Sequence, residues 1–371
     1  MPRTYDPLRK CLKIEEWPAP ECEAWNAALK KGGVFDKKGR AAHWKPLTVL
    51  ANAKSYGRWF SWLAREGKLD PQGGPCQQLT RENVDAYADH LLTMVSTGMA
   101  AHRLGDLYTV AKALVPDTDW SWMQAAWYRL RHDARPVKNK AARVVNARDL
   151  FRFGLDLMKR AERDETQSAL FRSRTYRDGL MIATLAARPL RRANFVSIRI
   201  GQHLVRRGED YWLLFTEEET KNEIELDWPF PEMLLPHLKR YLSEYRPALL
   251  AHHARDGRGY PPAGDHLWVS KYGSPLTAHG LYGVITDRTK KKFGRSVNPH
   301  LFRDSVATTY AIEQPAHVMS LKCLLGHHDG QTSERYYNQA RTTEASFEYQ
   351  HRLKRLRNRG SSRQSLDERS G

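Results

Sequence analysis

Cysteine is scarce in this chain, and its placement excludes two kinds of site. The 371 residues contain four cysteines, far apart at Cys11, Cys22, Cys76 and Cys323, with no CxxC pair and no short Cys/His spacing. A disulfide framework or a cysteine zinc site requires closely and regularly spaced cysteines. We therefore expect reduced thiols in an intracellular protein.

Long apolar runs are also missing. No stretch approaches the ~18 apolar residues that a membrane helix needs. The sequence begins MPRTYDPLRK, which contains no apolar segment of the kind found in secretory signals. These two absences predict a soluble, cytoplasmic protein.

Acidic residues are too few to balance the basic ones. The chain has 60 Lys and Arg against 42 Asp and Glu, a formal net charge of +18 and a sequence pI near 9.8. Such an excess indicates a polyanionic partner, above all nucleic acid, although ribosomal, chaperone and membrane-surface proteins share it. The hydrophobic content of 41% excludes a wholly disordered basic protein, and the length predicts about two domains.

The first part of the chain predicts a small helical domain behind an N-terminal extension. Residues 1–45 show no clear periodicity, and no role is assigned to them. Residues 46–132 contain apolar positions at three- and four-residue steps, with a loop at Pro71–Pro75 and a capping residue at Thr80. The repeated steps include Val49, Ala53, Tyr56, Phe60, Leu63, Leu104, Leu107 and Ala111.

A basic segment, residues 133–146, separates this domain from the rest. It has no apolar period and contains Pro136, as is typical of a linker. Its cations are candidates for contacts with DNA phosphates, with a solvated hinge as the alternative. They are Arg135, Lys138, Lys140 and Arg143.

A second, mainly helical domain is predicted for residues 147–345, followed by a basic tail at 346–371. Helical patterns begin near Ala147 and Thr175. The β-prone runs at 211–215 and 224–228 flank a polar tip and predict a hairpin with Lys221 at or near that tip. The expected fold class is therefore mainly α with a small β-hairpin, an α+β domain.

Polar residues in the last third of the chain suggest phosphate chemistry. Asn298-Pro299 is a typical helix start, which places His300 and Arg303 in one first turn, three residues apart. A helix N-terminus favours anions, so two cationic or donor side chains there suit a phosphate.

Two further elements follow in order. Pro315 begins a predicted helix that Gly326 ends, so His327 lies just beyond it, and Tyr336 follows nine positions later. Fixed cations and N–H donors stabilise a phosphate under attack, and a tyrosine can act as the covalent nucleophile. A metal site at His327, His328 and Asp329 is the rival interpretation.

The segment from His300 to Tyr336 resembles the catalytic motif of the tyrosine recombinase (phage integrase) family: HxxR, then LGH, then a tyrosine nine residues after that histidine. Upstream, residues 189–198 are similar to the family's first arginine box, with Arg191 in place of its arginine. The helical domain resembles the family's core-binding domain, so the resemblance covers about residues 45–345.

This resemblance implies a DNA strand-cleaving and rejoining enzyme with a two-domain clamp. It needs no cofactor and no metal. Its partners would be double-stranded DNA, a homo-tetramer on two sites and accessory DNA-bending or directionality proteins, in a bacterial, nucleoid-associated setting of a mobile element. Arg191, His300, Arg303 and His327 would bind the scissile phosphate, Tyr336 would attack it and Lys221 would protonate the leaving 5′-oxygen.

Departures from the family pattern leave some assignments open. Asn194 stands where the family usually has an acidic residue, and Arg188 and Arg192 compete with Arg191 for the arginine position. Tyr337 adjoins Tyr336, and residues 301–305 (LFRDS) differ from the commoner DLRHT.

Three functions compatible with the fold compete. The leading one is a site-specific recombinase that forms a 3′-phosphotyrosine intermediate. A type IB topoisomerase would use the same chemistry, and a catalytically silent DNA-binding protein would keep the fold alone.

Overall fold

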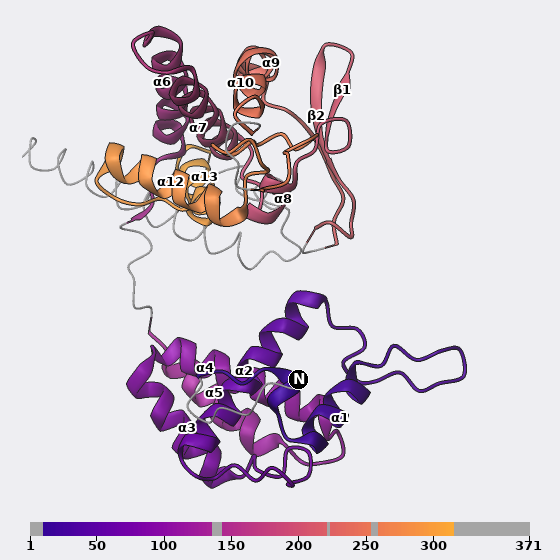
Figure 1. Cartoon of the computed structure of the whole chain (residues 1–371). Coiled ribbons are helices and arrows are strands. Elements are labelled where there is room, and N and C mark those ends of the chain that lie inside the picture. The colour runs from indigo at the N-terminus through magenta and orange to yellow at the C-terminus, as the bar shows by residue number, and fades with distance from the viewer. Residues whose placement is uncertain (1–9, 136–142, 221–222, 254–258, 315–371) are drawn as a thin grey trace, which may run out of the picture. The chain divides into compact units, whose positions relative to one another are not determined.

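The computed structural model describes residues 10–135, 143–220, 223–253 and 259–314, and these form two compact units. The division falls between Asn139 and Lys140, inside the basic segment 133–146. Figure 1 shows the elements of each unit. The units are described separately here as the N-terminal unit and the C-terminal unit.

In the described part of the N-terminal unit, all of the regular secondary structure is helical. Two of its helices have the side-chain caps that local sequence favours, because Thr80 accepts from the Asn83 amide at 3.2 Å and Ser96 accepts from the Met99 amide at 3.4 Å. The predicted cap at Thr80 is therefore confirmed. The helices are α1 (Ala19–Leu29), α2 (Pro46–Arg65), α3 (Arg81–Met94), α4 (Thr97–Leu114) and α5 (Ser121–Asp133), with a short 3₁₀ turn at Ile14–Glu16.

Aromatic side chains dominate the core of this unit. Trp17 lies edge-on to Tyr56 with ring centroids 5.3 Å apart, and Trp59 stacks on Trp62 at the same separation. Trp25 of α1 belongs to the same core. Such rings each bury a large apolar area, which makes a small domain stable.

Part of the region expected to lack periodic structure, residues 1–45, is therefore ordered and buried. Helix α1 escaped prediction because its buried face includes a carboxylate, Glu21, which is only 1% exposed. Glu21 accepts from the Tyr56 hydroxyl at 2.7 Å and from the Cys76 amide at 3.0 Å. Burial raises the pKa of Glu21. The apolar pattern of α1 is therefore interrupted at Glu21, whose side chain forms hydrogen bonds with distant residues in place of apolar contacts.

The C-terminal unit is built round α7, in which every residue from Thr175 to Ala186 is buried. Helix α6 crosses α7 closely at two glycines, because a Cβ on Gly179 would lie 2.6 Å from the Gly154 carbonyl oxygen. The helices are α6 (Ala147–Arg163), α7 (Ala169–Ala187), α8 (Arg192–Ser197), α9 (Leu235–Arg240), α10 (Arg246–Leu250), α12 (Ala278–Phe293) and α13 (Pro299–Glu313). A 3₁₀ turn lies at Glu232–Leu234 and a short π-helix at Tyr241–Tyr245.

A three-stranded antiparallel sheet in the order β1-β2-β3 lies at one side of this unit. β2 (Asp210–Phe215) pairs with β3 (Leu226–Pro229), with Phe215 opposite Leu226, which confirms the predicted hairpin. β1 (Leu204–Arg207) was not predicted, because two of its four residues are exposed arginines. It is held by its pairing with β2.

Within the described ranges, no helix is long and apolar enough to cross a membrane.

Candidate active site

The N-terminus of α13 holds two of the predicted site residues. Asn298 caps the helix, since its side-chain oxygen accepts from the amides of His300 and Leu301, each at 3.0 Å. The predicted helix start at Asn298-Pro299 is confirmed. His300 is exposed in the first turn, whereas Arg303 is 7% exposed.

The Arg303 guanidinium connects this helix to the turn between α7 and α8. Its Nη1 donates to the carbonyl oxygen of Pro189 at 2.6 Å, although the two residues are 114 positions apart in the chain. Arg191 lies two residues beyond Pro189, as the N-terminal flanking residue of α8. The structure therefore joins the HxxR segment to the segment that contains Arg191.

The three neighbouring arginines of this turn have different environments. Arg188 donates from Nε to the Pro229 carbonyl and from Nη1 to the Ala187 carbonyl, each at 3.2 Å, so it supports the backbone. Arg192 is exposed, and Arg191 is half-buried. Burial lowers the pKa of Arg191 and of Arg188, yet an arginine remains cationic at physiological pH.

The turn after β2, residues 216–220, is held by hydrogen bonds to Glu219. The backbone oxygen of Glu219 accepts from Asn194 Nδ2 at 2.9 Å, and its Oε1 lies 2.8 Å from His203 Nε2. Its Oε2 accepts from the Thr216 amide at 3.0 Å. The hydrogen bond from His203 is the main reason why the pKa of Glu219 is lowered. This turn leads directly into Lys221.

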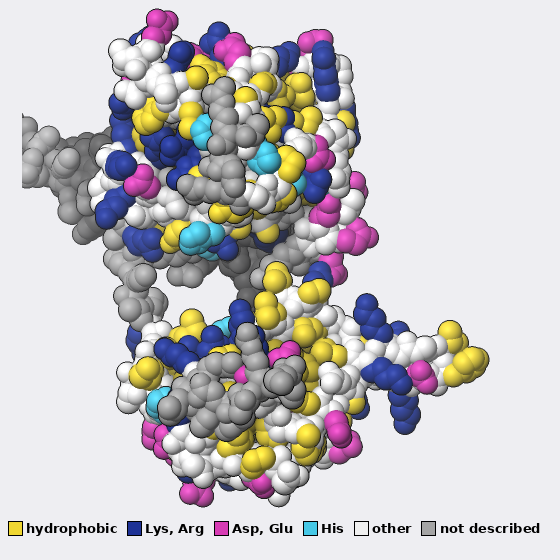
Figure 2. All heavy atoms as spheres, viewed as in Figure 1, with side chains coloured by type: hydrophobic (Ala, Val, Ile, Leu, Met, Phe, Trp, Pro, Cys, Tyr) yellow, Lys and Arg dark blue, Asp and Glu magenta, His cyan; other side chains and the backbone are white. Residues whose placement is uncertain are grey.

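Basic side chains cluster at the end of α12, just before α13. Lys290, Lys291 and Lys292 are exposed in its last turn, and Lys291 pairs with Asp287 at 3.0 Å. Arg143 donates to the Ser296 carbonyl in the loop between α12 and α13, at 3.3 Å. Figure 2 shows Lys and Arg side chains gathered around this part of the C-terminal unit. This surface suits a polyanion.

Several predicted residues lie outside the described residues. They are Lys138 and Lys140 of the basic segment, Lys221 at the hairpin, and His327, His328, Asp329, Tyr336 and Tyr337. Of the predicted phosphate contacts in the basic segment, Arg135 and Arg143 are described. Among the described residues, no group of three or more His, Cys, Asp or Glu side chains is arranged to hold a metal ion.

Sequence reasoning missed His203 and the contact role of Glu219. No local pattern marks either residue, since His203 lies before a strand that was itself not predicted. Asn194 had a signal, because it occupies an unusual position in the arginine box, but its partner lies 25 residues away. Only the folded arrangement reveals these contacts.

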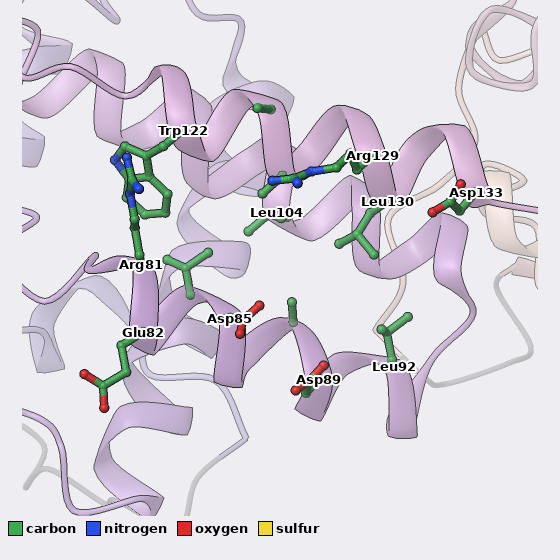
Figure 3. A pocket seen from close by; sticks show the side chains of 14 residues that line it. Arg81, Glu82, Asp85, Asp89, Leu92, Leu104, Trp122, Arg129, Leu130 and Asp133 are labelled. Atoms are coloured by element: carbon green, nitrogen blue, oxygen red, sulfur yellow. The ribbon is translucent and has the colours of Figure 1, made fainter.

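A separate hollow lies in the N-terminal unit, between α3 and α5. Figure 3 shows that Asp85 and Asp89 come from α3, whereas Trp122 and Arg129 come from α5. Its volume is about 560 Å³, and the Arg81 guanidinium lies 5.8 Å from the Trp122 ring centre. None of the site residues predicted from the sequence lines this hollow.

Comparison with known proteins gives a family match over the C-terminal unit. The Phage integrase family matches residues 156–343, just over half of the chain. Tyrosine recombinase XerC of Staphylococcus epidermidis (strain RP62A) is 28% identical over 180 residues, which are 47% of this chain and 55% of that protein. Tyrosine recombinase XerD of Listeria monocytogenes serotype 4b is 27% identical over 161 residues, 43% of this chain and 49% of that protein.

The chain thus matches about half the length of these curated relatives. Among solved structures, the XerH site-specific recombinase bound to difH substrate in a pre-cleavage complex is similar, with a TM-score of 0.53 and 17% identity over 81% of this chain and 79% of that chain. The post-cleavage complex of XerH with palindromic difH gives a TM-score of 0.52. At this identity, the likeness shows the fold.

Proposed function

Because this chain belongs to the phage integrase family, we propose that it is a site-specific DNA recombinase of the integrase or transposon type. It cuts and rejoins DNA strands through a 3′-phosphotyrosine intermediate. The observation that carries this proposal is the contact between Arg303 and the Pro189 carbonyl. It joins the two segments that contain Arg191, His300 and Arg303, which supports the proposal that these three side chains bind one phosphate.

The chemistry follows from these side chains and from the three that are not described. The Tyr336 hydroxyl releases its proton to water as its oxygen attacks the scissile phosphorus and forms the phosphotyrosyl bond, while the bond from phosphorus to the 5′-oxygen breaks. Lys221 gives its proton to that leaving oxygen. Arg191, His300, Arg303 and His327 neutralise the charge that develops on the non-bridging oxygens.

The reaction is reversible without a nucleotide. The phosphotyrosyl bond keeps the energy of the broken phosphodiester, so a 5′-hydroxyl from a partner strand can displace the tyrosine. The same cations that stabilise the first transition state stabilise the second, because both place charge on the same phosphate oxygens. No metal and no cofactor enters this scheme.

Arg191 is the preferred arginine of its box on structural grounds. The guanidinium of Arg188 donates to two backbone carbonyls and supports strand β3. Arg192 is solvent-exposed in the first turn of α8. Arg191 is half-buried beside Pro189, the residue that Arg303 contacts, and a partly desolvated cation interacts more strongly with a phosphate.

The partner is double-stranded DNA, as the XerH complexes and the basic surface near α13 suggest. We further propose that the enzyme acts as a homo-tetramer on two sites, with accessory DNA-bending or directionality proteins, in the bacterial cytoplasm on nucleoid DNA. Affinity is expected to fall steeply with salt, because several phosphates are neutralised. Arg135, Lys138, Lys140 and Arg143 are the proposed phosphate contacts of the basic segment.

A covalent-adduct experiment tests the chemistry. The protein is incubated with nicked duplexes from the DNA flanking its own gene, so that the short strand released by cleavage diffuses away and the adduct persists. We expect a protein–DNA band on a denaturing gel that Tyr336→Phe abolishes and Tyr337→Phe keeps. No band with the unaltered protein would favour a silent DNA-binding protein.

A second measurement separates recombination from supercoil relaxation. Two duplexes with different labels are mixed with the protein, and products that combine both labels are scored. We expect such products, since recombination joins strands from two sites. Relaxation of supercoiled DNA without any exchanged product would instead identify a topoisomerase.

A further inference from the structure

A loop of the N-terminal unit, residues 30–40, has a rigid base. The Gly39 amide donates to the Lys30 carbonyl at 2.9 Å, and the Ala41 amide donates to the Ala28 carbonyl at 2.8 Å. Gly39 has no room for a side chain, because a Cβ there would overlap the carbonyl of Ala28. The loop is therefore anchored to the end of α1 at both of its ends.

The tip of this loop is apolar and fully solvated. Val34 is 95% exposed and Phe35 is 101% exposed. Two neighbouring large apolar side chains at a tip gain nothing from the fold of their own unit, so exposing them to water is unfavourable unless a partner covers them. Figure 2 shows the loop projecting from the N-terminal unit with hydrophobic side chains at its end.

The flanks of the loop are strongly basic. Asp36 is its one acidic residue, and the Asp36 carboxylate lies 3.8 Å from the Lys30 ammonium. An excess of cations beside an apolar tip complements a polyanion that also offers apolar surface, and the edges and faces of DNA bases offer such surface within a groove. The exposed cations are Lys30, Lys31, Lys37, Lys38 and Arg40.

We propose that the 30–40 loop is a DNA-contacting finger. Its lysines and arginine bind backbone phosphates on both sides of a groove, and Val34 and Phe35 enter that groove against the bases. The partner is duplex DNA of any sequence, because cations and an apolar wedge recognise shape and charge rather than base edges. This inference rests on the proposed function only in that the partner is DNA.

Binding of a random-sequence duplex over a series of salt concentrations tests the finger. The double variant Lys37→Gln/Lys38→Gln is expected to reduce the slope of log affinity against log salt by about 2, because each phosphate contact contributes about 0.9. The variant Val34→Ser/Phe35→Ser is expected to weaken binding about 3- to 10-fold at an unchanged slope. Lys68→Gln and Met233→Ser, at exposed positions elsewhere, are the matched controls and should bind normally.

Two outcomes overturn the finger. Either both loop variants bind DNA as the unaltered protein does, or the apolar variant changes only self-association, measured by sedimentation, which would assign the tip to a second copy of the chain. Failure of the finger is distinguishable from failure of the proposed function. Adduct formation reports the chemistry, whereas these binding slopes require no cleavage.

A different observation carries a second inference, about the turn before Lys221. His203 Nδ1 accepts from the Arg199 amide at 3.0 Å, so the ring proton is on Nε2 and is donated to Glu219. The ring is 4% exposed and stacks on Phe215 with centroids 4.9 Å apart. His203 is therefore a fixed donor, and its orientation determines the position of the Glu219 carboxylate.

Glu219 receives hydrogen bonds from three separate parts of the unit. They come from Asn194 in α8, from His203 before β1 and from Thr216 at the end of β2. Asn194 follows Arg191 by three residues, so one side chain joins the arginine box to the hairpin turn. We infer that Asn194, His203 and Glu219 are positioning residues that hold the turn 216–220, which precedes Lys221 in the chain, to the helix that follows Arg191.

A substrate with a different leaving atom tests this inference, which rests on the proposed role of Lys221. A 5′-bridging phosphorothiolate has sulfur in place of the leaving 5′-oxygen. The leaving group is then a thiolate, which needs no proton from an acid because the pKa of the corresponding thiol is about 8.5. Asn194→Ala and Glu219→Ala are expected to slow cleavage of ordinary DNA about 10- to 100-fold, within the range of general acid catalysis. Both should cleave the sulfur substrate at the unaltered rate. Glu217→Gln, in the same turn, is the matched control.

The outcomes are distinct. If Lys221→Ala is rescued by sulfur but Asn194→Ala and Glu219→Ala are not, the two side chains stabilise the unit generally and the positioning inference is wrong. If Lys221→Ala itself is not rescued, the proposed acid role of Lys221 fails, and the positioning inference fails with it. Adducts formed by the unaltered protein would still support the tyrosine chemistry.

Discussion

The cores of the two units differ in the side chains that they bury. The N-terminal core is filled by rings such as Trp17, Tyr56 and Trp59. The C-terminal core contains an ion network beside its apolar side chains, in which Asp178 accepts from Arg177 at 2.6 Å and from Arg288 Nη2 at 2.9 Å. Aromatic rings fill volume with tolerant geometry, whereas buried charges require fixed partners. The unit that would hold a phosphate is thus the one whose interior contains a buried ion network among Arg177, Asp178 and Arg288.

That network connects elements that precede the site. Arg177 and Asp178 belong to α7, Arg288 belongs to α12, and Arg177 also donates to the Val269 carbonyl at 2.6 Å. Helix α7 leads to the turn that contains Arg191, and α12 leads to α13. The buried charges therefore fix the two helices from which the proposed phosphate ligands extend.

The largest expected effect is the loss of Asp178. Asp178→Ala leaves Arg177 buried without its carboxylate, which is expected to destabilise the C-terminal unit by about 3–5 kcal/mol. Hydrogen exchange of α7 peptides during denaturant titration measures this. The control is Asp227→Ala, which removes the half-exposed pair with Arg207 and should change stability by less than about 1 kcal/mol. Equal effects would contradict the view that the buried network stabilises this unit more than an exposed ion pair does.

The next effect concerns the crossing of α6 and α7. Gly179→Ala places a Cβ 2.6 Å from the Gly154 carbonyl and 2.9 Å from the Leu157 Cβ. Backbone cannot yield easily, so we expect a loss of about 1–3 kcal/mol in urea unfolding. Gly283→Ala in α12 meets nothing within 4 Å and should raise stability by about 0.5–1 kcal/mol, because alanine favours a helix.

The two confirmed helix caps allow a matched comparison. Asn298→Ala and Thr80→Ala are each expected to reduce the stability of their own unit by about 1 kcal/mol. Only Asn298→Ala should also slow adduct formation, since its cap defines the turn that presents His300. Unfolding curves and adduct rates for both variants check this. A similar loss of adduct in both would show that stability alone limits activity.

The smallest effect is a change in pH dependence in the N-terminal unit. Because burial raises the pKa of Glu21, its contribution to folding is complete below the unfolded value and is lost as pH rises through the raised value. Glu21→Gln removes this titration, so its stability relative to the unaltered protein should increase from pH 4 to pH 7. Thermal unfolding across that range measures it. A difference that stays constant with pH would contradict burial of a titrating carboxylate.

Local signals in the sequence predicted much of the fold. Helix periodicity located α2, α4, α6 and α7, and the caps at Thr80 and Asn298 located the starts of α3 and α13 correctly. The β-prone runs located the β2–β3 hairpin. Two missed elements, α1 and β1, have polar residues that interrupt the apolar pattern, and they depend on contacts with other segments, such as Glu21 with Tyr56.

The candidate site likewise has features that the sequence predicted and features that it did not. The types and order of Arg191, His300 and Arg303 were visible in the sequence. Their phosphate-binding roles stay predictions, as do the roles of Lys221, His327 and Tyr336. The contacts between the segments were not visible. His203 and Glu219 carry no motif, because a hydrogen bond between distant segments leaves no periodic trace.

The sequence by itself determined the net charge, the helix starts at Thr80 and Asn298, the β2–β3 hairpin and the order of the candidate phosphate-binding residues. The caps and the hairpin depend on neighbours within a few positions. Only the tertiary structure decided that Arg303 contacts the Pro189 carbonyl and that Asn194 and His203 meet at Glu219. These contacts depend on how α7, α8, the sheet and α13 pack together. Packing is a property of the whole unit, because each buried polar group must find its partner wherever the chain brings one.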